Sequence, residues 1–394
     1  MKEKIILGLG NNIDYEIVWD SRVFEEMIIQ YGIHKDELSN EIAVNSERDL
    51  VVSILGFLKE EVGGERYVVS PDIIEKFAKN FECRITMGGT SVRAAAAMRK
   101  LGYTSTLHLV TINDHVRRLL PPDCPYVCSA DEEHIYPHLI VQFTQGIKVT
   151  ASDIDIYTNR SNRIIYDNDP DNVEMKLTGN LRELITDAEV FLISGFNAMH
   201  SKTLLEKRLQ TLLEIMAVLP EKAYVFYEDA CFHDDCLSKT VRDTLIGKID
   251  IYSLNEDELQ GYLKRKLDLL KPDQMIRALE DVHQLIPVPV IVVHTRYWAL
   301  AYGMNAGLFA KALKGGINMA STRFRFGDDF TLENYHQTEQ NILQNEGVVF
   351  AEAMKRQLGE KVCCLACIQA EETKATTIGL GDAFVGGFLP ALIQ

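Results

Sequence analysis

The stretch TTIGLGDAFVGGFL, Thr376 to Leu389, places two glycines and an aspartate at the start of an apolar, helix-like segment. Gly379 and Gly381 can adopt positive φ and let a ligand approach the backbone closely. A helix that begins near Asp382 directs free N–H groups and a positive dipole end toward the same place. Such a place binds an oxyanion or a transferring phosphoryl group. The stretch therefore predicts an anion site at a helix start.

Two interpretations of Asp382 stay open from this motif alone. In one, the aspartate is an ordinary N-cap, and the glycines form the turn before it. In the other, it is a general base that accepts a proton from a substrate hydroxyl, while nearby N–H groups stabilise the phosphoryl charge. Gly386 and Gly387 each cost about 1 kcal/mol relative to alanine inside a helix, so they indicate close packing and slightly favour the second interpretation.

Composition limits the class of protein and its partners. The chain has 394 residues, 46% of them hydrophobic, which suits one large domain or a large domain with a small one. Its net charge of −16 makes nucleic acid and anionic membranes poor partners. No apolar run reaches the roughly 18 residues of a spanning helix, and the first residues lack the pattern of a signal peptide. We expect a cytosolic protein with free thiols and no zinc site.

Short apolar runs alternate with helical patterns along the chain. Residues 211–219 and 258–270 have the three-to-four spacing of amphipathic helices. The alternation predicts βαβ units and an α/β fold with a doubly wound, mostly parallel sheet. The runs that suit strands buried on both faces are KIILGLG near the start and residues 188–195, 223–229, 248–255, 289–295 and 362–369.

Two further regions are richer in β-branched and charged residues, with turn signals and period-two stretches. They predict a second, smaller sheet, a β-rich lid inserted into the core. The expected core comprises residues 1–14, 86–130 and 171–394, and the expected lid comprises part of residues 15–85 together with residues 131–170. In open α/β sheets the ligand crevice lies outside the carboxyl ends of the strands, where this chain has polar and small residues.

The stretch TTIGLGDAFVGG resembles the C-terminal signature of the ribokinase-like superfamily, and its Gly-Leu-Gly-Asp form is most similar to the ADP-dependent glucokinase and phosphofructokinase family. The resemblance implies a ribokinase-like sugar kinase that transfers a phosphoryl group from Mg-ADP to a hydroxyl of a hexose or hexose phosphate and leaves AMP. It implies Asp382 as the base and as a metal contact. It also implies that the backbone of Gly379, Leu380 and Gly381 stabilises the transferring group.

Two more segments resemble the family's metal-linked motifs. SLNEDELQGYL supplies Asn255 and Glu258, which by resemblance organise Mg²⁺ largely through water. Oxygen ligands at i and i+3 share one face of a helix start, although a capped helix with an acidic first turn has the same pattern. VFYEDACFHDD supplies Glu228 as a second metal-linked carboxylate, with Phe226 where the family has histidine.

Nucleotide and lid contacts are implied in the same way. VVHTRYWALAYG is similar to a family strand whose end, His294 and Thr295 here, lies near the nucleotide phosphates, and Thr377 of the signature is a further expected contact. STRFRFGDDFT, residues 321–331, resembles the segment that precedes the nucleotide pocket. NRIIYDNDP resembles a lid strand, and its Arg163 is the candidate to meet phosphate across the cleft. A surface arginine and a structural histidine remain the alternatives.

Sugar contacts are implied by three N-terminal segments, GLGNNIDYEIVWD, GGERYVVS and ITMGGTSVRAAAAMRKLGY. A carboxylate suits a sugar because it accepts hydrogen bonds from hydroxyl groups. Thr90 stands where the family has asparagine. The expected contacts are Asn12, Asp14, Glu65, Gly88 and Gly89.

Three alternatives remain: an ATP-dependent kinase of the same superfamily, a sugar- or nucleotide-binding homologue without catalysis, and a purely structural α/β protein. A sugar phosphate could use Arg66, Arg160 or Arg163. Glu65 favours a neutral sugar, because a carboxylate repels phosphate. The oligomeric state is not indicated.

Overall fold

The computed structural model describes residues 4–232, 234–369 and 378–393. Within them, the largest sheet has nine strands in the order β16-β15-β14-β13-β12-β11-β1-β5-β6. Neighbouring strands pair in parallel, except that β15 is antiparallel to both β14 and β16. The strands are β1 (Ile5–Leu7), β5 (Thr106–Leu109), β6 (Tyr126–Cys128), β11 (Val190–Ile193), β12 (Tyr224–Glu228), β13 (Ile251–Asn255), β14 (Val290–His294), β15 (Trp298–Gly303) and β16 (Val362–Ala366).

The six apolar runs of the sequence contain β1, β11, β12, β13, β14 and β16, so the predicted doubly wound, mostly parallel sheet is confirmed. Its two faces are buried in separate apolar clusters. Residues of α8 (Lys202–Met216), α9 (Asp235–Leu245), α10 (Glu256–Leu263), α11 (Pro272–Leu285) and α14 (Asn345–Leu358) pack on one face. Residues of α4 (Thr90–Lys100), α5 (Asp114–Leu119), α12 (Ala310–Phe326) and α15 (Leu380–Phe388) pack on the other. The remaining helices of this part are α6 (Pro170–Glu174), α7 (Asn180–Leu184) and α13 (Leu332–Glu339).

One predicted helix ends earlier than expected. Residues 258–270 were expected to be helical, but α10 ends at Leu263 because Lys264 adopts a left-handed conformation with φ of 51°. A new helix, α11, starts at Pro272, whose fixed φ suits a first helical turn. The other predicted helix, residues 211–219, forms the end of α8, which stops at Met216.

A smaller sheet of five strands, in the order β3-β10-β7-β2-β4, forms the second part of the molecule. Strand β2 begins at Asn12 and β4 begins at Cys83, so this sheet takes residues on both sides of the boundaries expected at residues 14 and 86. The hairpin β8–β9 extends from it. These strands are β2 (Asn12–Ile17), β3 (Gly64–Tyr67), β4 (Cys83–Gly88), β7 (Pro137–Phe143), β8 (Lys148–Ala151), β9 (Ile154–Tyr157) and β10 (Asn162–Asp167).

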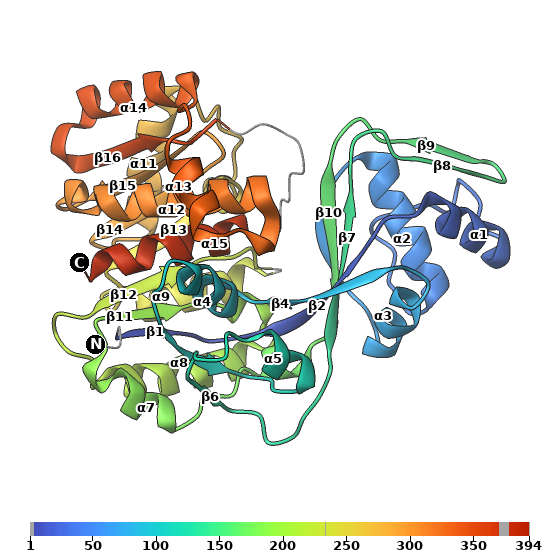
Figure 1. Cartoon of the computed structure of the whole chain (residues 1–394), viewed down its shortest axis with the longest axis horizontal. Helices are drawn as coiled ribbons and strands as arrows, with labels where there is room; N and C mark the ends of the chain where they lie inside the picture. The colour runs from blue at the N-terminus through green and yellow to red at the C-terminus, as the bar shows by residue number, and fades with distance from the viewer. Residues whose placement is uncertain (1–3, 233, 370–377, 394) are drawn as a thin grey trace.

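Three helices cover one face of the small sheet: α1 (Ser21–Tyr31), α2 (Glu47–Glu60) and α3 (Pro71–Ala78). The sequence pattern predicted strands in this range, and that prediction is wrong for these three segments. Helix α2 is buried from Leu50 to Leu58, so it lacks the polar stripe that marks an amphipathic helix. Figure 1 shows these helices and the β8–β9 hairpin at one end of the molecule, with β2 and β4 reaching toward the large sheet.

All eight cysteines are free thiols, as expected from the sequence. Cys231 and Cys236 are exposed and the other six are partly buried, so burial is less complete than the apolar sequence context suggested. Across the described ranges, no helix has both the length and the hydropathy to cross a membrane.

Candidate active site

A cavity of about 260 Å³ lies where the small sheet meets the carboxyl ends of β11 and β12 and the start of α15. Nine of the predicted site residues line it: Asn12, Asp14, Glu65, Gly88, Gly89, Arg163, Glu228, Gly379 and Asp382. Six others are not part of its lining: Asn255, Glu258, His294, Thr295, Leu380 and Gly381. The remaining one, Thr377, lies outside the described residues.

The small sheet contributes one polar face to the cavity. Alternate residues of β10, namely Arg163, Ile165 and Asp167, line the cavity, whereas Ile164 and Tyr166 lie in the apolar cluster beneath the helices. On the neighbouring strand β3, Glu65 lines the cavity, and it pairs in register with Ile165. The alternation of side chains along the strand therefore places one set of residues at the cavity and the other set in the buried core.

Helix α15 begins at the cavity without a side-chain cap. Its N-cap is Gly379, with φ of 63°, and no side chain accepts a hydrogen bond from its first turn. The interpretation of Asp382 as an N-cap is therefore wrong, since Asp382 is the third helical residue. The first-turn N–H groups and the positive end of the helix dipole are available to an anion at this point.

Asp14 is held by two neighbours. The Asn12 Nδ2 donates to Asp14 Oδ1 at 2.6 Å, and Arg93 Nη2 donates to Asp14 Oδ2 at 2.6 Å. The Arg93 Nε lies 3.8 Å from Asp382 Oδ2. One guanidinium therefore contacts both Asp14, the residue expected to hold the sugar, and Asp382, the expected base. Burial alone would lower the pKa of Arg93, but Asp14 and Asp382 raise it, so the side chain is a permanent cation.

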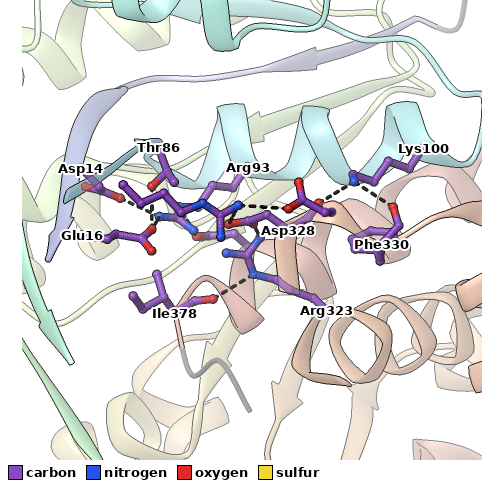
Figure 2. Close-up of polar contacts among 12 residues, drawn as sticks. Asp14, Glu16, Thr86, Arg93, Lys100, Arg323, Asp328, Phe330 and Ile378 are labelled. Atoms are coloured by element: carbon purple, nitrogen blue, oxygen red, sulfur yellow. Dashed lines mark hydrogen bonds and ion pairs between the residues drawn. The ribbon is translucent and has the colours of Figure 1, made fainter. Parts of the chain in front are cut away.

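A second arginine supports the turn before α15 (Figure 2). The Arg323 Nε donates to the carbonyl oxygen of Ile378 at 2.8 Å, and its Nη1 pairs with Asp328. Burial and the nearby charge of Arg93 lower the pKa of Arg323. The two guanidiniums flank Gly379: a Cβ built there would lie 2.7 Å from Arg93 Nη1 and 3.1 Å from Arg323 Nη2. Two cations beside a helix N-terminus favour the binding of an anion there.

Glu228 is buried at the end of β12, and its Oε2 has no hydrogen-bond partner. Its Oε1 lies 3.1 Å from Nε2 of His294, whose ring stacks on Phe384 of α15 at 4.7 Å between centroids. Burial alone would lower the pKa of His294, but the contact with Glu228 raises it. His294 therefore holds one carboxylate oxygen, and the other is buried without a hydrogen-bond partner.

Two more carboxylates lie behind Glu228. Asp229 accepts hydrogen bonds from Tyr262 Oη at 2.7 Å and Tyr252 Oη at 3.1 Å, and burial raises its pKa to about 6. Burial, followed by the charges of Asp229 and Glu228, raises the pKa of Glu258 well above its usual value. Buried carboxylates that repel one another favour a bound cation.

The pair Asn255 and Glu258 forms a capping box at the start of α10. The Asn255 backbone N–H donates to Glu258 Oε2 at 2.7 Å, and the Asn255 side chain donates to Glu258 Oε1 at 2.9 Å. Both glutamate oxygens are thus engaged locally. In the described part of the chain, no group of three acidic, histidine or cysteine side chains could hold a metal ion by itself.

Several residues of this site were not predicted from the sequence. His138 lines the cavity and lies 3.1 Å from Asp169 Oδ2; burial would lower its pKa, but Asp169, Asp167 and Asp14 raise it to about 9. A histidine in the alternating strand PHLIVQF was an available signal. Arg93 in the alanine-rich segment VRAAAAM was another, since a lone arginine in a buried helix needs a partner.

The two departures from the family pattern fall in different surroundings. Phe226 is fully buried, with its ring 5.4 Å from that of Phe388 of α15. It faces the core and not the cavity, so it packs α15 against the sheet. Thr90 lines the cavity as the first residue of α4.

The site combines an uncapped helix start, an aspartate in the first turn of that helix and a polar cavity covered by a small sheet. This combination is typical of lid-bearing α/β kinases that act on small molecules. The chain belongs to the ADP-specific phosphofructokinase/glucokinase family, whose conserved-region model matches residues 3–389. As a member it is an ADP-dependent sugar kinase, a phosphotransferase that acts on a sugar hydroxyl.

Solved structures confirm the fold. A phosphofructokinase from Pyrococcus horikoshii OT3 with AMP is 17% identical, with a TM-score of 0.79 over 100% of this chain and 98% of that one. An ADP-dependent kinase in complex with fructose-6-phosphate and ADPβS is 13% identical, with a TM-score of 0.73 over 100% and 94% of the two chains. At these identities the likeness shows that the chain shares the α/β fold of these kinases. A search of curated proteins found no match to this chain.

Proposed function

We propose that this kinase transfers a phosphoryl group from ADP to a hydroxyl of an uncharged hexose in the cavity between the two sheets, with Asp382 as the general base. The single observation that carries the proposal is the start of α15, where an uncapped first turn and Asp382 meet the same cavity as Asp14. A purely structural Asp382 would be expected to cap the helix, and it does not. Asp382 is partly exposed, with 22% of its side chain accessible, as a base that meets substrate must be.

The chemistry follows from this arrangement. A sugar held by Asp14 and Glu65 would present one hydroxyl to Asp382, which accepts its proton as the new O–P bond forms. The N–H groups of Leu380 and Gly381, together with Arg93 and Arg323, would stabilise the charge on the phosphoryl oxygens. The small sheet would exclude water, which would otherwise compete as acceptor.

The residues present fit a magnesium ion, which the family implies. Glu228 offers a buried oxygen without a partner, and Asp229 and Glu258 lie behind it as carboxyl groups whose mutual repulsion a cation would relieve. Since no three side chains among the described residues could complete a metal site, water and nucleotide phosphates would supply the other ligands, as is usual for Mg²⁺. The capping box of Asn255 and Glu258 would then act by holding α10 in place. Bound Mg²⁺ supplies positive charge that offsets the charge of the transferring phosphoryl group.

Replacing Glu228 with glutamine is expected to raise the Mg²⁺ concentration for half-maximal activity by roughly 10- to 100-fold. The amide keeps the shape and the contact with His294 but loses the charge. A titration of turnover against Mg²⁺ at saturating ADP measures the change. The matched control is Glu280→Gln on α11, an exposed glutamate that is not part of the cavity lining. An unchanged Mg²⁺ requirement in Glu228→Gln would remove Glu228 from the metal site.

The charge of the cavity supports a neutral hexose as acceptor. Seven carboxylates line it, against two arginines and two histidines. Three of the carboxylates, Glu65, Asp167 and Asp169, belong to the lid side, where a second phosphate would have to bind. Arg163 on β10 supports the competing acceptor, a hexose phosphate, which one structural relative binds. The proposal also includes a cytosolic location, supported by eight free thiols.

A phosphotransfer assay with Mg²⁺ tests the proposal, with ADP compared with ATP over a panel of free hexoses and hexose phosphates. AMP formation from ADP with a free hexose is the expected result. Turnover only with a hexose phosphate would overturn the neutral acceptor, and turnover only with ATP would overturn the donor. A thermal shift with nucleotide but no turnover with any pair would indicate a binding protein.

A further inference from the structure

The junction between the two sheets contains a buried arginine that the proposed chemistry uses only in part. Arg93 lies on α4, one turn after the Gly88–Gly89 turn, and its side chain is 6% exposed. We propose that Arg93 is a positioning residue, which fixes the sugar-holding Asp14 and the base Asp382 relative to each other through one guanidinium. This inference rests on the proposed function and adds a residue to it.

The first contact of Arg93 is with the small sheet. Its Nη2 donates to Asp14 Oδ2 at 2.6 Å and lies 3.7 Å from Oε1 of Glu16 on the same strand, β2. Glu16 in turn accepts from the hydroxyl of Thr86 on β4 at 2.6 Å, so the guanidinium joins two paired strands. With Asn12 holding the other oxygen of Asp14, the carboxylate has one fixed orientation.

The second contact of Arg93 is with the large part. Its Nε lies 3.8 Å from Asp382 Oδ2, and its Nη1 lies against the backbone of Gly379. Helices α4 and α15 pack together here, since Gly386 of α15 fits directly against Ala94 and Ala97 of α4. The backbone of α4 is therefore fixed to the base-bearing helix, and Arg93 reaches from that fixed point to β2 (Figure 2).

A guanidinium suits this task better than an ammonium group. Its five donors lie in a rigid plane, so it can contact Asp14, Asp382 and Glu16 in three directions without moving. A lysine at this position would keep the charge but would hold one partner at a time. The distance between the sugar hydroxyl and the base would then vary, and a misplacement of about 1 Å can cost roughly 10²-fold in rate.

The variant Arg93→Lys tests the inference, because it keeps the buried positive charge and is expected to fold. We expect kcat/KM for the hexose to fall by roughly 10²-fold, shared between a higher sugar KM and a lower kcat. The KM for ADP should stay within about twofold of wild type, because lysine keeps a positive charge beside the phosphoryl group. The control is Arg99→Lys on the same helix, where Arg99 forms an exposed ion pair with Asp123.

A double-mutant cycle with Asp14→Asn gives a second, independent measurement. If Arg93 acts through Asp14, the combined loss in kcat/KM should be clearly smaller than the product of the two single losses. Independent, multiplicative losses would overturn the inference. So would a folded Arg93→Lys enzyme, checked by circular dichroism, that keeps the wild-type sugar KM and kcat, or one that loses ADP and sugar binding equally. The wild-type assay tests the proposed function itself, whereas the ratios of the variants' kcat and KM to the wild-type values test only the role of Arg93.

Discussion

Asp382→Asn is expected to lower kcat by roughly 10²- to 10⁴-fold while leaving the fold and both KM values nearly unchanged. The amide has almost the same shape as the carboxylate but cannot accept the proton of the sugar hydroxyl. Stability should change little, because Asp382 is partly exposed and caps nothing in α15. The measurement is steady-state kinetics with ADP and the preferred hexose, together with a thermal unfolding curve.

The matched control for this variant is Asp114→Asn. Asp114 also lies in the first turn of a helix, α5, but its side chain is fully exposed and it is not part of the cavity lining. Each variant removes a negative charge near the positive end of a helix dipole. The resulting loss of stability should appear in both variants and amount to a few tenths to about 1 kcal/mol. Near-normal turnover in Asp382→Asn would refute the base assignment and would direct attention to another carboxylate of the cavity, such as Asp14.

Patterns that repeat along the chain were enough to predict most of the fold. Continuous apolar runs identified six strands of the large sheet, because strands buried on both faces have no polar alternation. Strand β15, with the sequence WALAYG, was missed because only a tight turn separates it from β14. The lid helices were missed for a related reason: α2 is buried almost throughout, and its sequence lacks an amphipathic period.

The candidate site could be predicted where its residues are fixed by local structure. Asp14 lies near the start of β2, Glu228 ends β12 and Gly379 begins α15, and all three line the cavity. Arg93 could not be assigned a role, because its partners Asp14 and Asp382 are 79 and 289 positions away in the chain. His294 was expected at the nucleotide phosphates, and the structure shows that it contacts Glu228, a pairing that depends on the order of strands in the sheet.

The glycine that begins α15 gives the second large effect. Gly379→Ala is expected to lower kcat by about 10²-fold and to destabilise the fold by roughly 1–2 kcal/mol. The loss of stability arises because Gly379 has φ of 63°, which a residue with a Cβ adopts at a cost. The loss of rate arises because the added Cβ would lie 2.7 Å from Arg93 Nη1, closer than such atoms approach, and 3.1 Å from Arg323 Nη2, a tight contact. Both guanidiniums, or the first turn of α15, would have to shift.

Gly32→Ala separates these two causes, because Gly32 ends α1 with nearly the same φ of 58° and has no atoms within 4 Å of an added Cβ. Both variants should therefore lose similar backbone stability, measured as the free energy of unfolding in denaturant, whereas only Gly379→Ala should lose kcat. Equal kcat in the two variants would mean that the turn tolerates a methyl group and that phosphoryl transfer does not depend on close approach to this backbone. A selective loss in Gly379→Ala would show that the glycine is required by the two arginines and by the anion site that they flank.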